Sequence, residues 1–458
     1  MRWPALLSSL VLSVFTFGLA PTARAAEKLN VLFIASDDLR PDLGCYGNTL
    51  MHTPNLDRLA KVSLRFNRAY VQYPLCNPSR TSMLTGRHPT TTGVLDNTRW
   101  FGAEHPDWVT MPKFFKQNGY ASLRTGKAFH GGIDDTEAWT EGGDKRQFEG
   151  AINTKRKGQV AANSDRIVVL EGDGESHGDY KTATRAVEYL EQHKDKPFFL
   201  FCGFTKPHSP PTTTQKFLDL YDVKKIPLPV DFAAQPKAPA GFPELSVPKR
   251  SSDLFIGRDA SESEAREVIR AYWASASFMD AQAGRVLEAL DRLKLRDKTI
   301  IVFWGDHGYH LGEKGKWSKH NSLFEIGTRV PLLISVPGGK GNGQVCERPV
   351  QSLDIYPTLA ELCGLTPQMG LQGHSLAPLL RDPKAKWEHP AFTVTRINNV
   401  LGRAVRTEKW RYAEWDEGQQ GAMLFDAQKD PHELKNLAND AKHAGVVKEM
   451  KKMLQSIQ

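Results

Sequence analysis

The feature that most constrains the fold is a set of apolar runs that end abruptly in polar residues. Four such runs occupy residues 28–38, 120–130, 197–210 and 299–308. They are continuous rather than alternating, which is typical of strands buried on both faces of a sheet. Helical periodicity separates them at residues 53–62, 179–193 and 263–293. This alternation predicts an α/β fold with a doubly wound, mostly parallel sheet flanked by helices.

The residues that follow these runs are candidates for a shared site, because the carboxyl ends of parallel strands meet at one edge of a sheet. Asp37 and Asp38 end the first run, and Asp306 and His307 end the last. A surface carboxylate pair that caps a helix is one interpretation. A divalent cation is the other: three carboxylates suit Ca²⁺ or Mg²⁺, and the histidine leaves Mn²⁺ open.

Lysines and histidines at the remaining strand ends could hold an oxyanion and move protons. They are Lys127, His130, Lys206, His208 and, further along the chain, Lys319. Taken singly, each is more often a solvated surface residue or a hydrogen-bonded histidine, and Lys206 in particular could be no more than that.

Cys76 stands directly before Asn-Pro-Ser-Arg. Pro78 favours a first helical turn and Gly86 a helix end, so the sequence predicts a short polar helix with Cys76 at its N-terminus. Arg80 follows one turn later. A buried thiol, a redox-sensitive thiol and a thiolate nucleophile all remain open from the residues alone, although a thiolate matches a hard, oxygen-liganded cation poorly.

The run from Cys76 to Arg80, continued by Leu-Thr-Gly-Arg at residues 84–87, matches the sulfatase signature C-x-P-S-R followed by L-T-G-R. The chain resembles the type I sulfatases of the alkaline-phosphatase superfamily over nearly all of its length after residue 25. Gly-Lys-Ala-Phe-His at residues 126–130 and the dipeptide Asp306-His307 resemble the iduronate-2-sulfatase branch. Many other sulfatases carry asparagine in place of His307.

The resemblance implies that a dedicated maturation enzyme oxidises Cys76 to formylglycine (3-oxoalanine), so we expect an exposed thiol without a partner. The formylglycine hydrate would then attack the sulfur of a sulfate ester. The implied cation ligands are Asp37, Asp38, Asp306, His307 and the modified Cys76, with Ca²⁺ favoured over Mg²⁺ or Mn²⁺. The other implied roles are holding the hydrate (Arg80, Lys127), accepting its proton (His130) and binding the sulfate (His208, Lys319), with His208 also a possible acid.

The expected substrate is a sulfated carbohydrate. The formal charge of +8 is mildly basic, and without a basic stripe it gives little support to nucleic-acid binding. Two alternatives stay open: a phosphoester or phosphonate hydrolase, and a non-catalytic secreted glycan-binding relative. Specificity is expected from residues 94–105, where Arg99 could meet a sugar carboxylate, and from the irregular residues 131–178.

The chain divides into three predicted parts: a signal peptide at 1–25, a catalytic domain at 26–375 and a smaller α+β subdomain with a short antiparallel sheet at 376–458. Arg2, an apolar stretch at 5–20 and Ala-Arg-Ala at 23–25 predict export to the periplasm or the extracellular space. That stretch is too short to span a membrane, and the proline-rich residues 225–250 predict an extended loop.

Five cysteines leave at least one without a disulfide partner. Cys202 is expected as a buried strand thiol, and Cys346 and Cys363 could pair. The sequence carries no signal for the oligomeric state.

Overall fold

The computed structural model describes Met1 and residues 28–153, 165–249 and 252–455. The expected signal peptide therefore lies, apart from Met1, outside the described residues. The main sheet of the described chain has the strand order β10-β2-β8-β7-β1-β5-β3, with β9 beside β2. Its strands are β1 (Asn30–Asp37), β2 (Leu64–Tyr70), β3 (Ala121–Gly126), β5 (Phe198–Pro207), β7 (Thr299–Gly305), β8 (Arg329–Ser335), β9 (Val345–Cys346) and β10 (Val350–Gln351).

The sheet is mostly parallel. β1 lies between β5 and β7 and is parallel to both, with Phe33 opposite Phe201 on one side and Val302 on the other. β3 continues the parallel arrangement beyond β5, whereas β8 runs antiparallel to both β7 and β2. The predicted α/β class is confirmed, with one reversed strand inside the sheet.

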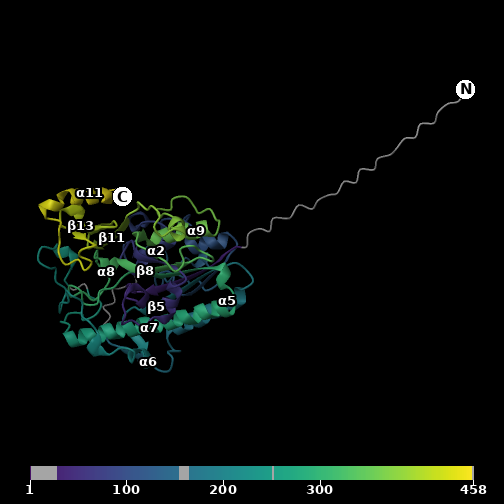
Figure 1. The fold of residues 1–458 in the computed structure, drawn as a ribbon, viewed down its shortest axis with the longest axis horizontal. Helices are drawn as coiled ribbons and strands as arrows, with labels where there is room; N and C mark the ends of the chain where they lie inside the picture. The colour runs from purple at the N-terminus through teal and green to yellow at the C-terminus, as the bar shows by residue number, and fades with distance from the viewer. Residues whose placement is uncertain (2–27, 154–164, 250–251, 456–458) are drawn as a thin grey trace.

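Helices cover both faces of the main sheet, which explains the continuous apolar runs. Leu32 and Ile34 of β1 pack into one core with helices α1, α5 and α7, while Val31 and Phe33 pack into a second core with α2, α4 and α9. Figure 1 shows the long α7 lying along one side of the sheet. The helices are α1 (Pro54–Ala60), α2 (Cys76–Thr85), α3 (Pro89–Thr92), α4 (Met111–Gln117), α5 (Gly178–His193), α6 (Gln215–Leu218), α7 (Glu262–Arg292), α8 (Glu325–Thr328), α9 (Ile355–Leu362), α10 (Ala377–Arg381) and α11 (Ala444–Leu454).

The C-terminal region forms a second, antiparallel sheet in the order β11-β12-β13-β14, as predicted. Trp415 and Phe425 face the main body on one side, and Tyr412 and Leu424 face α11 on the other. Its strands are β11 (Ala391–Ile397), β12 (Val400–Arg406), β13 (Trp410–Trp415) and β14 (Ala422–Asp426). α10 still packs into the main core, and the domain boundary at residue 375 stays a prediction.

The small sheet is attached to the segment that leads into α2. The backbone N–H of Val394 donates to the carbonyl of Gln72 at 2.9 Å, and the Thr393 hydroxyl donates to the carbonyl of Val71 at 2.6 Å. Val394 also packs against Tyr73 and Leu75. The segment that leads from β2 to Cys76 therefore lies between the main sheet and the small sheet.

Outside the sheets, the irregular regions broadly match expectation. The described part of residues 131–178 is mostly irregular and includes a 3₁₀ turn, the isolated bridges at Glu141 and Ile152, and β4 (Val168–Leu170), which pairs with β6 (Thr212–Thr214). Residues 225–249 form an irregular segment of turns and loops that holds the end of η4 and all of η5. The short 3₁₀ helices are η1 (Gly44–Tyr46), η2 (Phe101–Ala103), η3 (Thr136–Ala138), η4 (Val223–Lys225), η5 (Glu244–Ser246), η6 (Arg296–Lys298), η7 (Ser352–Asp354), η8 (Asp416–Gly418) and η9 (Ala441–His443).

The cysteine pattern differs from one expectation. Cys202 is fully buried in β5, as predicted, but Cys346 and Cys363 are both free thiols. Cys346 lies on β9 beside β2, while Cys363 follows α9 near the carbonyl of Leu29, so the fold separates them. Within the described ranges, the chain has no helix of the length and apolarity that crossing a membrane requires.

Candidate active site

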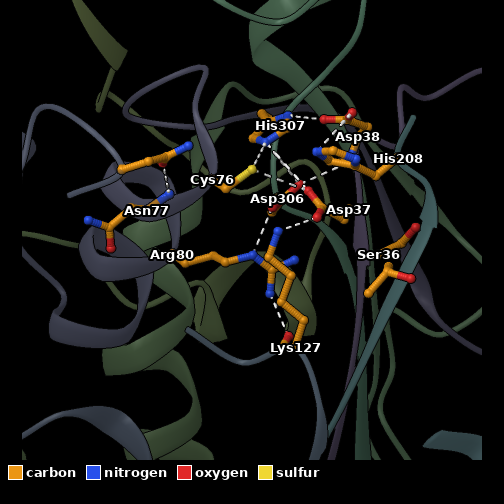
Figure 2. Close-up of polar contacts among 12 residues, drawn as sticks. Ser36, Asp37, Asp38, Cys76, Asn77, Arg80, Lys127, His208, Asp306 and His307 are labelled. Carbon is orange, nitrogen blue, oxygen red and sulfur yellow. Dashed lines mark hydrogen bonds and ion pairs between the residues drawn. The ribbon is translucent and has the colours of Figure 1, made fainter. Parts of the chain in front are cut away.

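Five segments that are distant in the sequence meet at one edge of the main sheet. Figure 2 shows Asp37, Asp38, Asp306 and His307 from the ends of β1 and β7 facing Cys76 at the start of α2. Lys127, beyond β3, and His208, beyond β5, complete the cluster. The predicted convergence of the strand ends is present in the structure.

The two inner carboxylates each bind a cationic side chain through one oxygen. Asp37 Oδ2 accepts from Lys127 Nζ, and Asp306 Oδ2 accepts from Arg80 Nε at 2.8 Å. Their other oxygens face inward. Asp37 Oδ1 lies 3.5 Å from Cys76 Sγ, and Asp306 Oδ1 lies 3.4 Å from His307 Nε2.

Asp38 occupies an outer position. Its φ of +64° breaks the strand geometry, a conformation that costs a non-glycine residue on the order of 1 kcal/mol or more. The turn is held by the Tyr272 hydroxyl, which donates to the Asp38 carbonyl at 2.6 Å. The Asp38 side chain then reaches His307 Nδ1 at 3.2 Å and Lys319 Nζ at 3.0 Å. It therefore orients both groups.

Cys76 is buried, contrary to the expectation of an exposed thiol, with only 1% of its surface accessible. The burial follows from how α2 begins. The Asn77 side-chain amide donates to the carbonyls of Asp96 and Arg99, and the Ser79 hydroxyl donates to the carbonyl of Asp306. These hydrogen bonds hold the first turn of α2 against the strand ends and attach the 94–105 loop to it.

The surroundings of Cys76 favour a negative charge. Burial raises the pKa of its thiol, but Lys127, Lys319 and His307 lower it by more, so that the pKa lies well below its usual range. His307 Nε2 is 3.3 Å from the sulfur, and His130 forms a further hydrogen bond with it. The site is therefore suited to an anionic oxygen or sulfur at this position.

Arg80 ties the helix to the segment after β3. Its Nη1 donates to the carbonyls of Lys127 at 2.6 Å and of Ala128 at 3.1 Å. Its side chain is fully buried, and Nη2 has no hydrogen-bond acceptor among the described residues. A buried guanidinium N–H without an acceptor is costly, so Arg80 Nη2 can donate a hydrogen bond to a bound anion.

His208 and Lys206 have different surroundings. His208 Nδ1 donates to the Ser209 carbonyl at 2.8 Å, and Nε2 faces Lys319 Nζ at 3.2 Å. With its side chain 34% exposed, His208 lies at the opening of the site. Lys206 is buried instead, and its ammonium donates to the carbonyls of His208 and Pro210, so it supports the loop and is not a surface lysine.

The charges within the cluster are unequal. Burial, followed by repulsion from Asp37, raises the pKa of Asp306 to about 7. Burial lowers the pKa of His307, but Asp306 and Cys76 raise it by more, to about 9. Asp306 and His307 are therefore buried, ionisable neighbours, and buried charges of this kind are stable only when they are paired or bind a metal ion.

The donor set fits a divalent metal ion. Ligand atoms of Asp37, Cys76, Asp306 and His307 lie within 4.8 Å of one another, and a second group joins Asp37 and Asp38 to His208. The predicted ligands are therefore brought together, but in two groups that share Asp37. The arrangement indicates an acidic metal site without identifying the ion.

Sequence reasoning missed two residues near Lys319. The Asp253 carboxylate lies 3.7 Å from Lys319 Nζ and 3.2 Å from His320 Nε2. No sequence motif marks Asp253 or His320, so only the fold shows that they lie beside Lys319. The predicted specificity residue Arg99 is ion-paired with Glu104.

Comparisons with known proteins agree with this geometry. A family model described as Sulfatase matches residues 29–365, and one described as N-sulphoglucosamine sulphohydrolase, C-terminal, matches residues 312–458. The chain is 34% identical to a sulfatase of Formosa agariphila, covering 99% of this chain and 91% of that protein. It is 31% identical to the iduronate 2-sulfatase of Mus musculus, covering 97% and 98%.

Solved structures share the fold. A 2-O GAG sulfatase superposes with a TM-score of 0.72 at 26% identity, covering 94% of this chain and 92% of its own. The phosphonate monoester hydrolase of Agrobacterium radiobacter superposes with a TM-score of 0.72 at 22% identity, covering 94% and 95%, and shows the fold alone. The signature around Cys76, the acidic cluster and the family match together place the chain in the sulfatase family, as a hydrolase of sulfate esters.

Proposed function

We propose that this sulfatase is exported and removes an O-sulfate group from a sulfated carbohydrate, in the manner of the iduronate 2-sulfatases. The observation that carries the proposal is the position of Cys76, which lies 3.3 Å from His307 and 3.5 Å from Asp37 and within the electrostatic influence of Lys127 and Lys319. The names of the similar proteins, an iduronate 2-sulfatase and a 2-O GAG sulfatase, support a glycan substrate.

We further propose that Cys76 is converted to formylglycine by a maturation enzyme and that the cation is Ca²⁺, held by Asp37, Asp38, Asp306, His307 and the modified residue. When present, these two groups supply a nucleophilic oxygen and a Lewis acid. Oxygen donors from three carboxylates suit Ca²⁺. Arg80 Nη2 is a buried donor available to an oxygen at position 76.

The remaining side chains bind the sulfate and move protons. Lys319 is buried and Lys127 is partly buried, and although burial lowers the pKa of each, neighbouring carboxylates raise it by more, so both stay charged and can hold sulfate oxygens. His208 stands at the opening, where it can donate a proton to the leaving oxygen. His130 contacts residue 76 and can accept its proton.

The first test replaces the reacting residue. Cys76→Ala should abolish release of inorganic sulfate from sulfated oligosaccharides, while Cys363→Ala, a free thiol outside the site, should retain it. Mass analysis of the tryptic peptide that carries Cys76 reports whether formylglycine has formed. Retained turnover in folded Cys76→Ala protein would refute the assignment.

The second test separates the alternatives. Paired aryl sulfate and aryl phosphate substrates should show a preference for sulfate, and a phosphate preference would favour a phosphoester or phosphonate hydrolase. Protein that carries formylglycine and binds sulfated glycans without turnover would support a non-catalytic relative. Arg99→Ala tests whether the 94–105 loop recognises a sugar carboxylate, in which case KM should rise while kcat stays unchanged. Arg185→Ala, at a half-exposed arginine, is the control.

A further inference from the structure

The cluster around Cys76 has a second chemical state in the folded chain, because the cysteine encoded by the sequence is a sulfur ligand. We propose that the folded protein with unmodified Cys76 binds Zn²⁺ between Cys76 Sγ, His307 Nε2 and one oxygen each of Asp37 and Asp306. This inference concerns the chain before any oxidation of Cys76, and it stands whether or not the proposed function is correct.

The spacing of the four atoms suits a small tetrahedral ion. Zinc bonds of about 2.0–2.3 Å give a tetrahedron with edges of about 3.4 Å. The sulfur of Cys76 lies 3.3 Å from His307 Nε2 and 3.5 Å from Asp37 Oδ1. His307 Nε2 lies 3.4 Å from Asp306 Oδ1 and 3.7 Å from Asp37 Oδ1. Four edges therefore match, and the other two are within 4.8 Å.

The types of donor decide between ions. A thiolate and an imidazole are softer ligands than Ca²⁺ or Mg²⁺ accepts, whereas both are preferred ligands of Zn²⁺. All four residues are buried, so water competes weakly for the ion. The identity of residue 76, sulfur or oxygen, would thereby select the metal.

Each ligand is already oriented by an outer partner. His307 Nδ1 donates to the Gly308 carbonyl at 3.2 Å and also lies 3.2 Å from Asp38 Oδ1, which leaves Nε2 free to face the cluster. Lys127 holds the far oxygen of Asp37, and Arg80 holds the far oxygen of Asp306. Such partners fix the direction of metal ligands and are worth about 10–100-fold in affinity. The cationic partners also offset the charge of a thiolate and two carboxylates.

The experiment uses full-length protein made without the maturation enzyme, with an unmodified Cys76 verified by peptide mass and with metals removed by a chelator. Titration with Co²⁺ should give one bound ion with intense tetrahedral d–d bands and a sulfur-to-cobalt charge-transfer band. Zn²⁺ should abolish both signals stoichiometrically, and a large excess of Ca²⁺ should not. An octahedral spectrum without charge transfer, or displacement by Ca²⁺, overturns the proposal.

Variants locate the sulfur. Cys76→Ser should lose the charge-transfer band and at least about 100-fold in Zn²⁺ affinity, and Asp38→Asn should keep the band while losing about 10–100-fold. Cys363→Ser, the matched control, should behave as the parent protein. Equal Zn²⁺ affinity in folded Cys76→Ser protein contradicts the proposal, and should that variant not fold, the parent spectrum decides.

Discussion

Arg80 offers the sharpest test of how the active site is held together. Replacing it with lysine keeps one charged contact to Asp306 but removes the Nη1 donor shared by the carbonyls of Lys127 and Ala128. Each lost hydrogen bond contributes about 0.5–1.5 kcal/mol, and a buried acceptor left without a donor costs about 1–3 kcal/mol. We therefore expect Arg80→Lys to lower the free energy of unfolding by about 2–4 kcal/mol.

The same change should reduce activity beyond its effect on stability. The released backbone carries Lys127 and leads to His130, and a displacement of about 1 Å at reacting groups can cost about 100-fold in rate. We expect kcat to fall by at least that factor at a temperature where the variant remains folded. Urea unfolding followed by tryptophan fluorescence and sulfate release from a glycan substrate measure the two effects.

Arg87→Lys is the matched control. Arg87 is also buried, donates to the carbonyls of Thr85 at 2.8 Å and Met369 at 3.3 Å, and packs over Trp108, but it lies outside the cluster. We expect a similar loss of stability with kcat close to that of the parent protein. A change below about 0.5 kcal/mol for Arg80→Lys, or an equal loss of kcat in both variants, would show that the reasoning is wrong.

Three further outcomes follow from the structure. Phe201→Ala should lower the free energy of unfolding, measured by urea denaturation, by about 3–5 kcal/mol. The reason is that Phe201 is fully buried and stacks on Phe33, with the ring centroids 4.8 Å apart. Burial raises the pKa of Asp354 from 3.8 to about 7, so the free energy of unfolding should decline by up to about 4 kcal/mol as pH rises from about 4 to 7. Asp354→Asn should flatten this decline, and an unchanged dependence of the free energy on pH would contradict the prediction. Chelation of divalent cations from the mature protein should lower Tm and sulfate release together, with Ca²⁺ restoring both; loss of neither would count against a resident cation.

The strands and helices that build the site could be predicted because their patterns are local. A run such as residues 299–308 is apolar on both faces, and the rule that parallel strands end at one edge brings its Asp306 to Asp37. The direction of β8 could not be predicted in this way. Its residues are as continuously apolar as those of the parallel strands, and it is reversed because residues 306–328 stay at the edge where β7 ends, so that β8 begins there.

Burial and pairing of the site residues were beyond the sequence as well. Cys76 was expected to be exposed as the substrate of a maturation enzyme, yet the polar groups beside it bond to the backbone of other segments and enclose it. Asp37 and Asp38 are adjacent residues of the same type, and the positive φ of Asp38, which turns it out of the strand, could not be predicted from the sequence. Asp253 reaches Lys319 through a loop whose path no pattern specifies.

The attachment of β11 to residues 71–75 has a consequence for how this enzyme could be altered. β11 of the small sheet binds the backbone segment that leads to Cys76, through the hydrogen bonds from Val394 and Thr393. The C-terminal region is therefore not an appendage that could be trimmed or exchanged between relatives without penalty. We expect damage to the core of this region to reduce turnover through these two bonds, although none of its described side chains contacts the predicted metal ligands.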